Sequence, residues 1–241
     1  MFQIFKKILK QILPEELIKV INKQRTKLRF KNSKNNKAIF TKIYKEKLWG
    51  DSGNAFNSGS GSDYANSQSY INLINNFLDE KNIKIIVDLG CGDYRVASKF
   101  NLKERAYIGC DIVDDLIKRN NKIFSNKNIS FICLDVIEDE IPKGDLLLIR
   151  QVLQHLSNDD ISNLIKKIKI RKAFKYIIVT DELPISNVHK INPDVLKGAT
   201  RIENNGGLYL EKEPFNIKVK VLLDRVTSDD NLRLRSVLLE I

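Results

Sequence analysis

Apolar runs and amphipathic stretches alternate along most of this 241-residue chain. Continuous apolar runs of about five to seven residues are typical of strands that are buried on both faces of a parallel sheet. Five such runs lie at residues 84–89, 106–111, 129–135, 145–149 and 175–180. The alternation of these runs with helical patterns predicts an α/β fold built on a parallel sheet.

The segments between the runs carry helix signals. Asp63 is placed to cap a helix that extends to about Glu80, because apolar residues recur there at helical spacing. We also expect helices from about Tyr94 and over residues 114–121. Ser157 is placed to cap a later helix, with acidic residues in its first turn, where the helix dipole favours them.

The C-terminal part predicts a β-hairpin. Two apolar runs, at residues 215–224 and 232–241, flank the polar turn 227–231. Together with the five earlier runs, the hairpin brings the expected number of strands to seven.

The first predicted strand ends in a glycine turn, Asp88-Leu89-Gly90-Cys91-Gly92. The two glycines let the backbone turn sharply and let a ligand approach closely. The dinucleotide fingerprint G-x-G-x-x-G needs a third glycine at position 95, where this chain has Arg95. The Walker pattern G-x-x-x-x-G-K-[ST] is also absent from the sequence. The sequence at the turn therefore argues against a dinucleotide or a nucleoside triphosphate as the ligand.

Acidic residues also end the next two predicted strands. Asp111 follows the glycine turn by about 20 residues, a spacing at which a carboxylate accepts both ribose hydroxyls of a nucleoside. Asp135 ends the third strand. One aspartate at such a place is commonly a cap or turn residue. Three of them on successive strands, with Asp88 as the first, indicate one shared ligand crevice.

The run Val-Asp-Leu-Gly-Cys-Gly at residues 87–92 resembles the first motif of class I S-adenosylmethionine-dependent methyltransferases. The resemblance covers roughly residues 40–241. It implies a Rossmann-like seven-stranded sheet in the order 3-2-1-4-5-7-6, with the last strand antiparallel. It also implies S-adenosyl-L-methionine (SAM) as cofactor and S-adenosyl-L-homocysteine (SAH) as product, with Asp135 at the adenine amino group and Ile112 on the ring. The chain departs from the pattern at Tyr94, where many members have a further glycine.

Trp49, the only tryptophan, precedes a Ser-Gly-Ser-Gly-Ser segment at residues 58–62. Such a segment is a flexible linker or a lid over the ligand. A Trp-Gly pair, this loop, a helix and the glycine turn together resemble methyltransferases associated with bacterial surface-polysaccharide (capsule and lipopolysaccharide) biosynthesis. We expect Trp49, Ser60 and Gly61 to contact the cofactor or to close its pocket.

The candidate site combines these loop, turn and strand-end residues. Arg150 and Gln151 follow the fourth strand and are expected to hold the methionine end of the cofactor or an anionic acceptor. The expected cofactor-binding residues are Trp49, Ser60, Gly61, Asp88, Gly90, Cys91, Gly92, Asp111, Ile112, Asp135, Val136, Arg150 and Gln151.

Transfer to a hydroxyl benefits from a general base, which must lie at the carboxyl ends of the strands. His155, Asp181 and Glu182 are the catalytic candidates, although His155 also fits a structural role beneath the site. The sequence has no C-x-x-C or H-x-E pattern, so we expect no metal.

The formal net charge of +11 resides in the N-terminal segment. Residues 1–47 hold 14 basic and 3 acidic residues, whereas the remaining 194 residues hold 27 of each sign. Residues 2–13 and 15–27 predict amphipathic helices. We therefore divide the chain into a basic helical extension with a linker, residues 1–38, and a methyltransferase domain, residues 39–241. The extension has three alternative roles: packing within the protein or a dimer, contact with a membrane surface through residues 1–30, or binding of nucleic acid, which is the least expected.

Three widely spaced cysteines argue against a disulfide framework, and no apolar run is long enough to cross a membrane. We expect a cytoplasmic protein, with contact at the inner face of the membrane as an option. The leading hypothesis is O-methylation of a saccharide, nucleotide-sugar or phosphate-linked precursor of a bacterial surface glycan. The alternatives are an RNA methyltransferase that uses the basic segment, and a non-catalytic scaffold.

Overall fold

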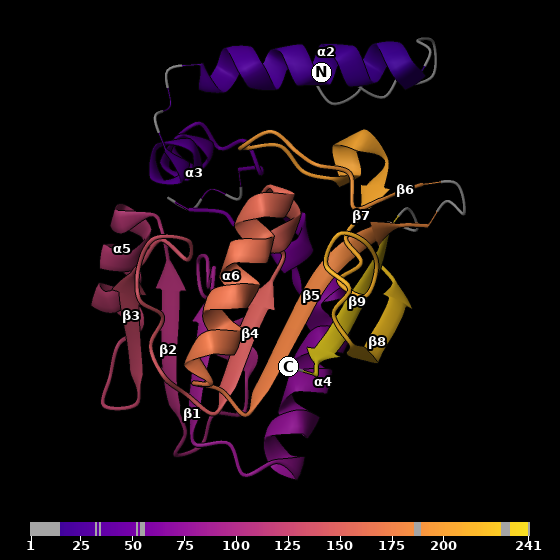
Figure 1. The fold of residues 1–241 in the computed structure, drawn as a ribbon. Coiled ribbons are helices and arrows are strands. Elements are labelled where there is room, and N and C mark those ends of the chain that lie inside the picture. Colours follow the sequence, from indigo (N-terminus) through magenta and orange to yellow (C-terminus); the bar gives the residue numbers. More distant parts are fainter. Residues whose placement is uncertain are drawn as a thin grey trace.

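A seven-stranded mixed sheet forms the centre of the molecule, in the order β3-β2-β1-β4-β5-β9-β8 (Figure 1). The structure, a computed structural model, describes residues 15–240 except 32, 34, 52, 54–55, 186–188 and 228–231. The strands of the sheet are β1 (Ile85–Leu89), β2 (Ala106–Asp111), β3 (Ile129–Cys133), β4 (Leu146–Arg150), β5 (Tyr176–Pro184), β8 (Val219–Val226) and β9 (Leu232–Leu239).

The first five strands are parallel and have the predicted order, and β9 runs antiparallel to both β5 and β8. Two short strands, β6 (Lys190–Ile191) and β7 (Gly206–Gly207), form a separate ladder that the sequence analysis did not predict. Because they come before the final hairpin, the last two strands of the sheet are the ninth and eighth, and not the seventh and sixth, of the chain. Strands of two residues carry too little hydrophobic pattern to be predicted.

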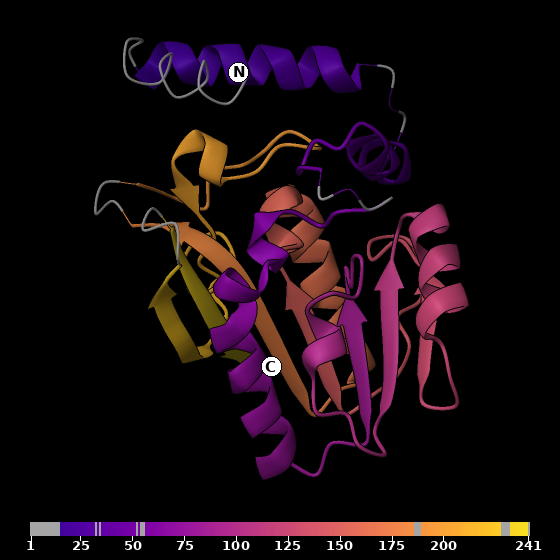
Figure 2. The same ribbon diagram turned by 180° about the vertical axis from the view of Figure 1, so that it is seen from behind.

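Helices cover both faces of the sheet. Helix α6 lies on the face seen in Figure 1, and α4 lies on the opposite face, seen in Figure 2. Helices α2 and α3 lie beyond the edge at which the parallel strands end. The α-helices are α2 (Glu15–Phe30), α3 (Asn36–Lys45), α4 (Tyr64–Glu80), α5 (Asp114–Phe124) and α6 (Asn158–Arg171); the short 3₁₀ turns are η1 (Ser60–Ser62), η2 (Ala97–Lys99), η3 (Leu153–His155) and η4 (Ile202–Asn204).

Alternate residues of the central strands enter two separate cores. On β4, Leu147 and Ile149 pack on the α6 side, whereas Leu146 and Leu148 pack on the α4 side. All four are at most 2% exposed. This two-sided burial is the physical reason for the unbroken apolar runs in the sequence.

Some predicted boundaries are wrong. The expected helix from about Tyr94 does not form; only the short turn η2 follows the glycine turn. Tyr94 itself has φ 67°, which no α-helical residue adopts. The third strand ends at Cys133, two residues before Asp135. Ser157 caps α6 as expected, by accepting a hydrogen bond from the Asp160 N–H at 3.1 Å.

Asp63 precedes α4 as predicted, but its side chain makes no capping bond and accepts from Arg95 Nη1 at 2.8 Å instead. Helix α3 begins at Asn36, so the proposed division after residue 38 falls inside it. The helix expected at residues 2–13 lies outside the described residues. Among the described helices, none has the length and apolar character needed to cross a bilayer.

Candidate functional site

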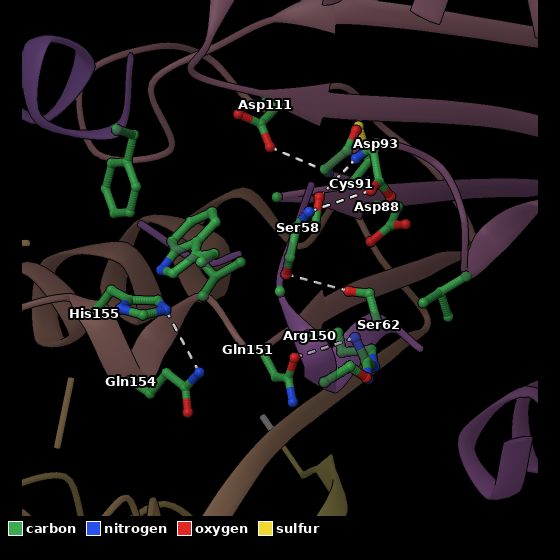
Figure 3. Close-up of a pocket in the computed structure, with 18 of the residues that line it drawn as sticks. Ser58, Ser62, Asp88, Cys91, Asp93, Asp111, Arg150, Gln151, Gln154 and His155 are labelled. Carbon is green, nitrogen blue, oxygen red and sulfur yellow. Dashed lines mark hydrogen bonds between the residues drawn. The ribbon is translucent and has the colours of Figure 1, made fainter. Parts of the chain in front are cut away.

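A cavity of about 330 Å³ opens where β1, β2 and β4 end, beneath α3 and the segment that carries the Ser/Gly run. Figure 3 shows side chains from these elements converging on it, with Asp88, Cys91 and Asp111 on one side and Gln154 and His155 on another. Of the predicted cofactor-binding residues, all but Asp135 line the cavity: Trp49, Ser60, Gly61, Asp88, Gly90, Cys91, Gly92, Asp111, Ile112, Val136, Arg150 and Gln151.

The glycine turn shapes one wall. Gly90 and Gly92 have φ 74° and 56°, and a Cβ on Gly90 would collide with Val152. Tyr94 adopts the same left-handed conformation, although it has a large side chain. Its ring packs on Phe131 with the ring centroids 5.0 Å apart, within a larger aromatic cluster. The backbone therefore keeps the conformation that glycine favours, and ring packing offsets the strain at Tyr94.

Asp111, at the end of β2, is held beside the glycine turn. Its two carboxylate oxygens accept backbone hydrogen bonds from Gly92 and Val113, each at 3.1 Å. Burial raises the pKa of Asp111 to about 6. Each oxygen keeps a further lone pair, so the carboxylate can accept hydrogen bonds from a ligand in a fixed direction.

A second polar group lies where β1 and β4 end. Asp88 accepts a hydrogen bond from the Tyr107 hydroxyl at 2.7 Å, and burial raises its pKa to about 6. Arg150 donates through Nη2 to the Gly61 carbonyl at 2.5 Å and lies over the Tyr70 ring. Among the described residues, neither Arg150 Nε nor Gln151 Nε2 has a hydrogen-bond partner, although both are buried. Buried donors without partners indicate a place where a ligand supplies acceptors.

Gln151 also has an unusual backbone conformation. Its φ of 55° lies in the left-handed region, which is uncommon for a residue other than glycine. The hydrogen bond from its N–H to the Thr180 carbonyl, 2.7 Å long, holds it there. Strained residues of this kind cluster at functional sites, and this one turns the chain from β4 into the cavity wall.

The Ser/Gly segment is fastened to the glycine turn by side chains that the sequence analysis missed. Ser58 and Asp93 form two hydrogen bonds with one another. Arg95 donates to Asp63 at 2.8 Å, to Asn57 at 3.1 Å and to the Gly59 carbonyl at 3.2 Å. The sequence signal for these contacts was the arginine at position 95, where the dinucleotide motif has its third glycine. The segment is therefore an anchored wall of the cavity.

An aromatic wall faces the carboxyl end of β4. Phe40 and Trp49 lie against His155, with ring centroids 6.0 and 5.5 Å from its ring. His155 Nδ1 lies 3.2 Å from the Ala199 carbonyl oxygen. A carbonyl only accepts, so we assign the proton to Nδ1, which leaves Nε2 as an acceptor. Burial lowers the pKa of His155 to about 4, so the ring is neutral at neutral pH.

Of the predicted site residues Glu182, Asp181 and Asp135, only Glu182 lies at the cavity. Glu182 lines the cavity, whereas Asp181 points to the other face of β5, as strand alternation requires. Burial raises the pKa of Asp181 to about 7. Asp135 is absent from the cavity wall, because β3 has already ended and its carboxylate accepts from the Ile137 N–H at 3.0 Å. We therefore leave Asp135 and Asp181 out of the site that we propose. Within the described part of the chain, no group of three or more His, Cys, Asp or Glu side chains could hold a metal ion.

Comparison with known proteins identifies the fold. No protein-family model matches the sequence, and no curated protein does either. Solved structures do match. The magnesium protoporphyrin IX methyltransferase ChlM from Synechocystis PCC 6803 with bound SAH aligns over 85% of this chain and 99% of its own, with a TM-score of 0.54 and 15% identity. The plantazolicin methyltransferase BpumL in complex with SAH aligns over 94% of this chain and 98% of its own, with a TM-score of 0.52 and 15% identity.

The N-methyltransferase NodS from Bradyrhizobium japonicum WM9 aligns over 75% of this chain and 99% of its own, with a TM-score of 0.50 and 12% identity. The chain therefore has the α/β fold of class I methyltransferases. At these identities the likeness concerns the fold, and chemistry has to be argued from the cavity itself.

Proposed function

We propose that the chain is a SAM-dependent methyltransferase. The observation that carries the proposal is Asp111, whose buried carboxylate is fixed by the Gly92 and Val113 N–H groups at the rim of a cavity beside a glycine turn. In an open α/β sheet, this is the place at which a nucleoside ribose is bound. ChlM and BpumL, which share the fold, have been crystallised with SAH.

The residues of the cavity fit each part of the cofactor. We assign the ribose hydroxyls to Asp111, and the adenine ring to the apolar side chains of Ile112 and Val136. At the other end, Asp88 suits the ammonium of the methionine part. The partnerless donors Arg150 Nε and Gln151 Nε2 suit its carboxylate. Gly90 leaves room for the Val152 side chain, which lines the cavity and which a Cβ at position 90 would displace.

SAM, when bound, supplies a methyl group on a sulfonium centre. The chain has to align an acceptor with that methyl group and exclude water. The anchored segment at residues 57–63 closes one side of the cavity, and Phe40 and Trp49 form an apolar wall on another. These elements can orient the acceptor and exclude water, but they contribute no acid, base or nucleophile to the reaction.

We propose a hydroxyl as the acceptor and His155 as the residue that receives its hydrogen bond. His155 Nε2 is the acceptor atom of a neutral ring whose orientation is fixed by the Ala199 carbonyl and the aromatic wall. It accepts a long hydrogen bond, 3.5 Å, from Gln154 Nε2, which the acceptor hydroxyl would replace or share. Its lowered pKa makes it a weak base, so its main contribution is to orient the hydroxyl. Glu182 lines the same cavity and is the second candidate for accepting the proton.

A saccharide remains the proposed acceptor class, and its support is the resemblance of the Trp49 and 58–62 segments to glycan-associated methyltransferases. The cavity refines this class. Its lining includes five carboxylates and one arginine: Asp88, Asp93, Asp111, Glu182, Glu203 and Arg150. This balance disfavours a phosphate at the reacting end, so we propose that a neutral saccharide hydroxyl reacts, even where a phosphate lies elsewhere in the precursor. The same balance disfavours an RNA backbone in the cavity.

Two experiments test the proposal. Trp49 is the only tryptophan and lines the cavity, so its fluorescence should respond to SAM and SAH with saturation. Incubation with methyl-labelled SAM and a panel of neutral glycosides, each paired with its sugar phosphate, should label the neutral member of a pair. A saturable SAH signal with label only on phosphates would overturn the acceptor assignment. The absence of any response to SAM and SAH would favour the scaffold reading.

A further inference from the structure

Helix α2 has an apolar row on its outer side. Leu17, Val20, Ile21 and Leu28 are 44, 54, 38 and 71% exposed. Their spacings of three, four and seven residues place them on one face of the helix. The opposite face carries Phe30, which is buried with Ile39 and Ile43 of α3. The helix is thus attached by one face and presents the other, apolar face outward.

Basic residues flank this row. At about 100° per residue, Arg25 and Arg29 lie to one side of the row and Lys27 lies to the other. All three side chains are exposed, as is that of Lys31, just beyond the helix. In sequence, residues 15–31 contain six basic and two acidic residues. An exposed apolar row with basic borders matches an amphipathic helix that lies in the interface of an anionic membrane.

We propose that this outer face of α2 binds the surface of an anionic lipid membrane. Charge complementarity selects this occupant. A second copy of the chain, docked through the same face, would bring two sets of basic residues together. A nucleic acid would use the basic borders but would leave the apolar row without a partner. Anionic headgroups over an acyl layer satisfy both parts of the surface.

The position of α2 determines where a bound membrane would lie relative to the cavity. The helix lies beyond the edge where the parallel strands end, and it contacts η4 (Figure 1). Ile202 of η4 lines the cavity. A membrane bound by α2 would therefore lie on the same side of the molecule as the cavity, where a lipid-linked acceptor would be within reach. This consequence rests on the proposed function; the binding itself does not.

The test uses the full chain and two kinds of vesicle. One kind is made of phosphatidylcholine alone, and in the other about one third of the lipid is phosphatidylglycerol. We expect co-sedimentation with the anionic vesicles, weakened by raised salt, and at least tenfold weaker association with neutral vesicles. Equal association with both kinds of vesicle at low and high salt would overturn the proposal, and so would no association with either.

Variants locate the surface. Leu28→Glu should weaken association with anionic vesicles by more than tenfold, and Lys27→Gln by about fivefold. The matched controls are on α6: Ile170→Glu replaces a residue that is 72% exposed, and Lys166→Gln replaces an exposed lysine. Both controls should bind as the wild type does.

Thermal unfolding of each variant checks that α2 substitutions leave the fold intact. Sedimentation velocity without lipid tests the competing occupant. If Leu28→Glu converts a dimer into a monomer and leaves vesicle binding unchanged, the face binds a second copy and the proposal is wrong. Loss of binding in the α2 variants alone, at unchanged thermal stability, supports it.

Discussion

Ser58 and Asp93 are joined by two hydrogen bonds that run in opposite directions. The Ser58 N–H donates to the Asp93 carboxylate at 3.2 Å, and the Asp93 N–H donates to the Ser58 hydroxyl at 2.9 Å. They lie 35 residues apart, one before α4 and the other in the glycine turn. The pair fixes the Ser/Gly segment to the turn, so the wall of the cavity is formed before a ligand arrives. Preorganisation of this kind lowers the cost of ordering a loop on binding.

Replacement of Ser58 by Ala should loosen this wall. The Asp93 N–H and the Tyr44 hydroxyl each lose a partner, and a buried polar group without one costs about 1–3 kcal/mol. We expect SAH binding to weaken by about fivefold to thirtyfold, measured by calorimetric titration. Ser162→Ala is the matched control, because the exposed Ser162 hydroxyl donates to the Asn158 carbonyl on α6 and does not line the cavity. Equal affinities for the wild type and Ser58→Ala would contradict a positioning role for the pair.

The glycine turn predicts a steric effect that can be separated from backbone strain. Gly90 and Gly53 have similar φ angles, 74° and 78°, but only at Gly90 would a Cβ meet a neighbour, the side chain of Val152. Both Gly→Ala changes cost about 1–2 kcal/mol for the left-handed conformation. Overpacking should add roughly 1–3 kcal/mol at Gly90.

Urea unfolding of Gly90→Ala and Gly53→Ala measures the difference between the two changes. The double variant Gly90→Ala/Val152→Ala should recover part of the loss, because it removes the methyl group that the new Cβ meets. If Gly90→Ala lowers the free energy of unfolding by no more than Gly53→Ala does, Val152 does not pack closely against position 90.

The raised pKa values of Asp88 and Asp111 predict that cofactor affinity depends on pH. Burial raises both pKa values to about 6. Both carboxyls are therefore ionised above that pH and become protonated as the pH falls through it. Since the ionised forms accept the hydrogen bonds of the cofactor, SAH affinity should be constant from pH 7 to 8 and should decline below pH 6. Calorimetry from pH 5 to 8 checks this; a constant affinity over the whole range is the contrary result.

His155 predicts a stability effect of defined sign. Its pKa is about 6.5 in an unfolded chain and about 4 in the folded protein, so between these values the unfolded state binds the extra proton. Stability from this group is complete above about pH 6.5 and is lost as the pH falls towards 4, by on the order of 3 kcal/mol.

The difference in unfolding free energy between the wild type and His155→Gln isolates this effect, because the raised carboxyl pKa values act on both proteins alike. The difference should increase from pH 4 to 6.5 in favour of the wild type. If it is the same at both pH values, the ring is not buried in its neutral form.

The sequence predicted the elements that depend on regular burial. The strand that ends at Asp111 and its carboxylate at the glycine turn follow from an apolar run and a fixed spacing, and both occur in the structure. Asp135 also follows an apolar run, but β3 ends two residues before it. The side chain of Asp135 accepts a hydrogen bond from the Ile137 N–H and closes a local turn. A hydrophobic pattern cannot place the last residue of a strand so closely.

Contacts between distant segments could not be predicted. Arg95 was read only as the absence of a glycine, whereas its guanidinium holds Asn57, Gly59 and Asp63 in place. Phe40 lies just after the predicted linker, and the sequence analysis assigned it no role, yet it forms part of the aromatic wall at His155. These roles arise from tertiary packing, which leaves no periodic signal in one sequence.

The most direct test of the account is calorimetric titration of the wild type and of Asp111→Ala with SAH. Asp111 is the single group that the account assigns to the ribose, and the change removes both acceptor oxygens without adding bulk. We predict micromolar, one-to-one binding to the wild type and at least a thirtyfold loss in Asp111→Ala, with thermal stability retained. No binding to the wild type, or equal binding to both proteins, would contradict the claim that this cavity holds the cofactor.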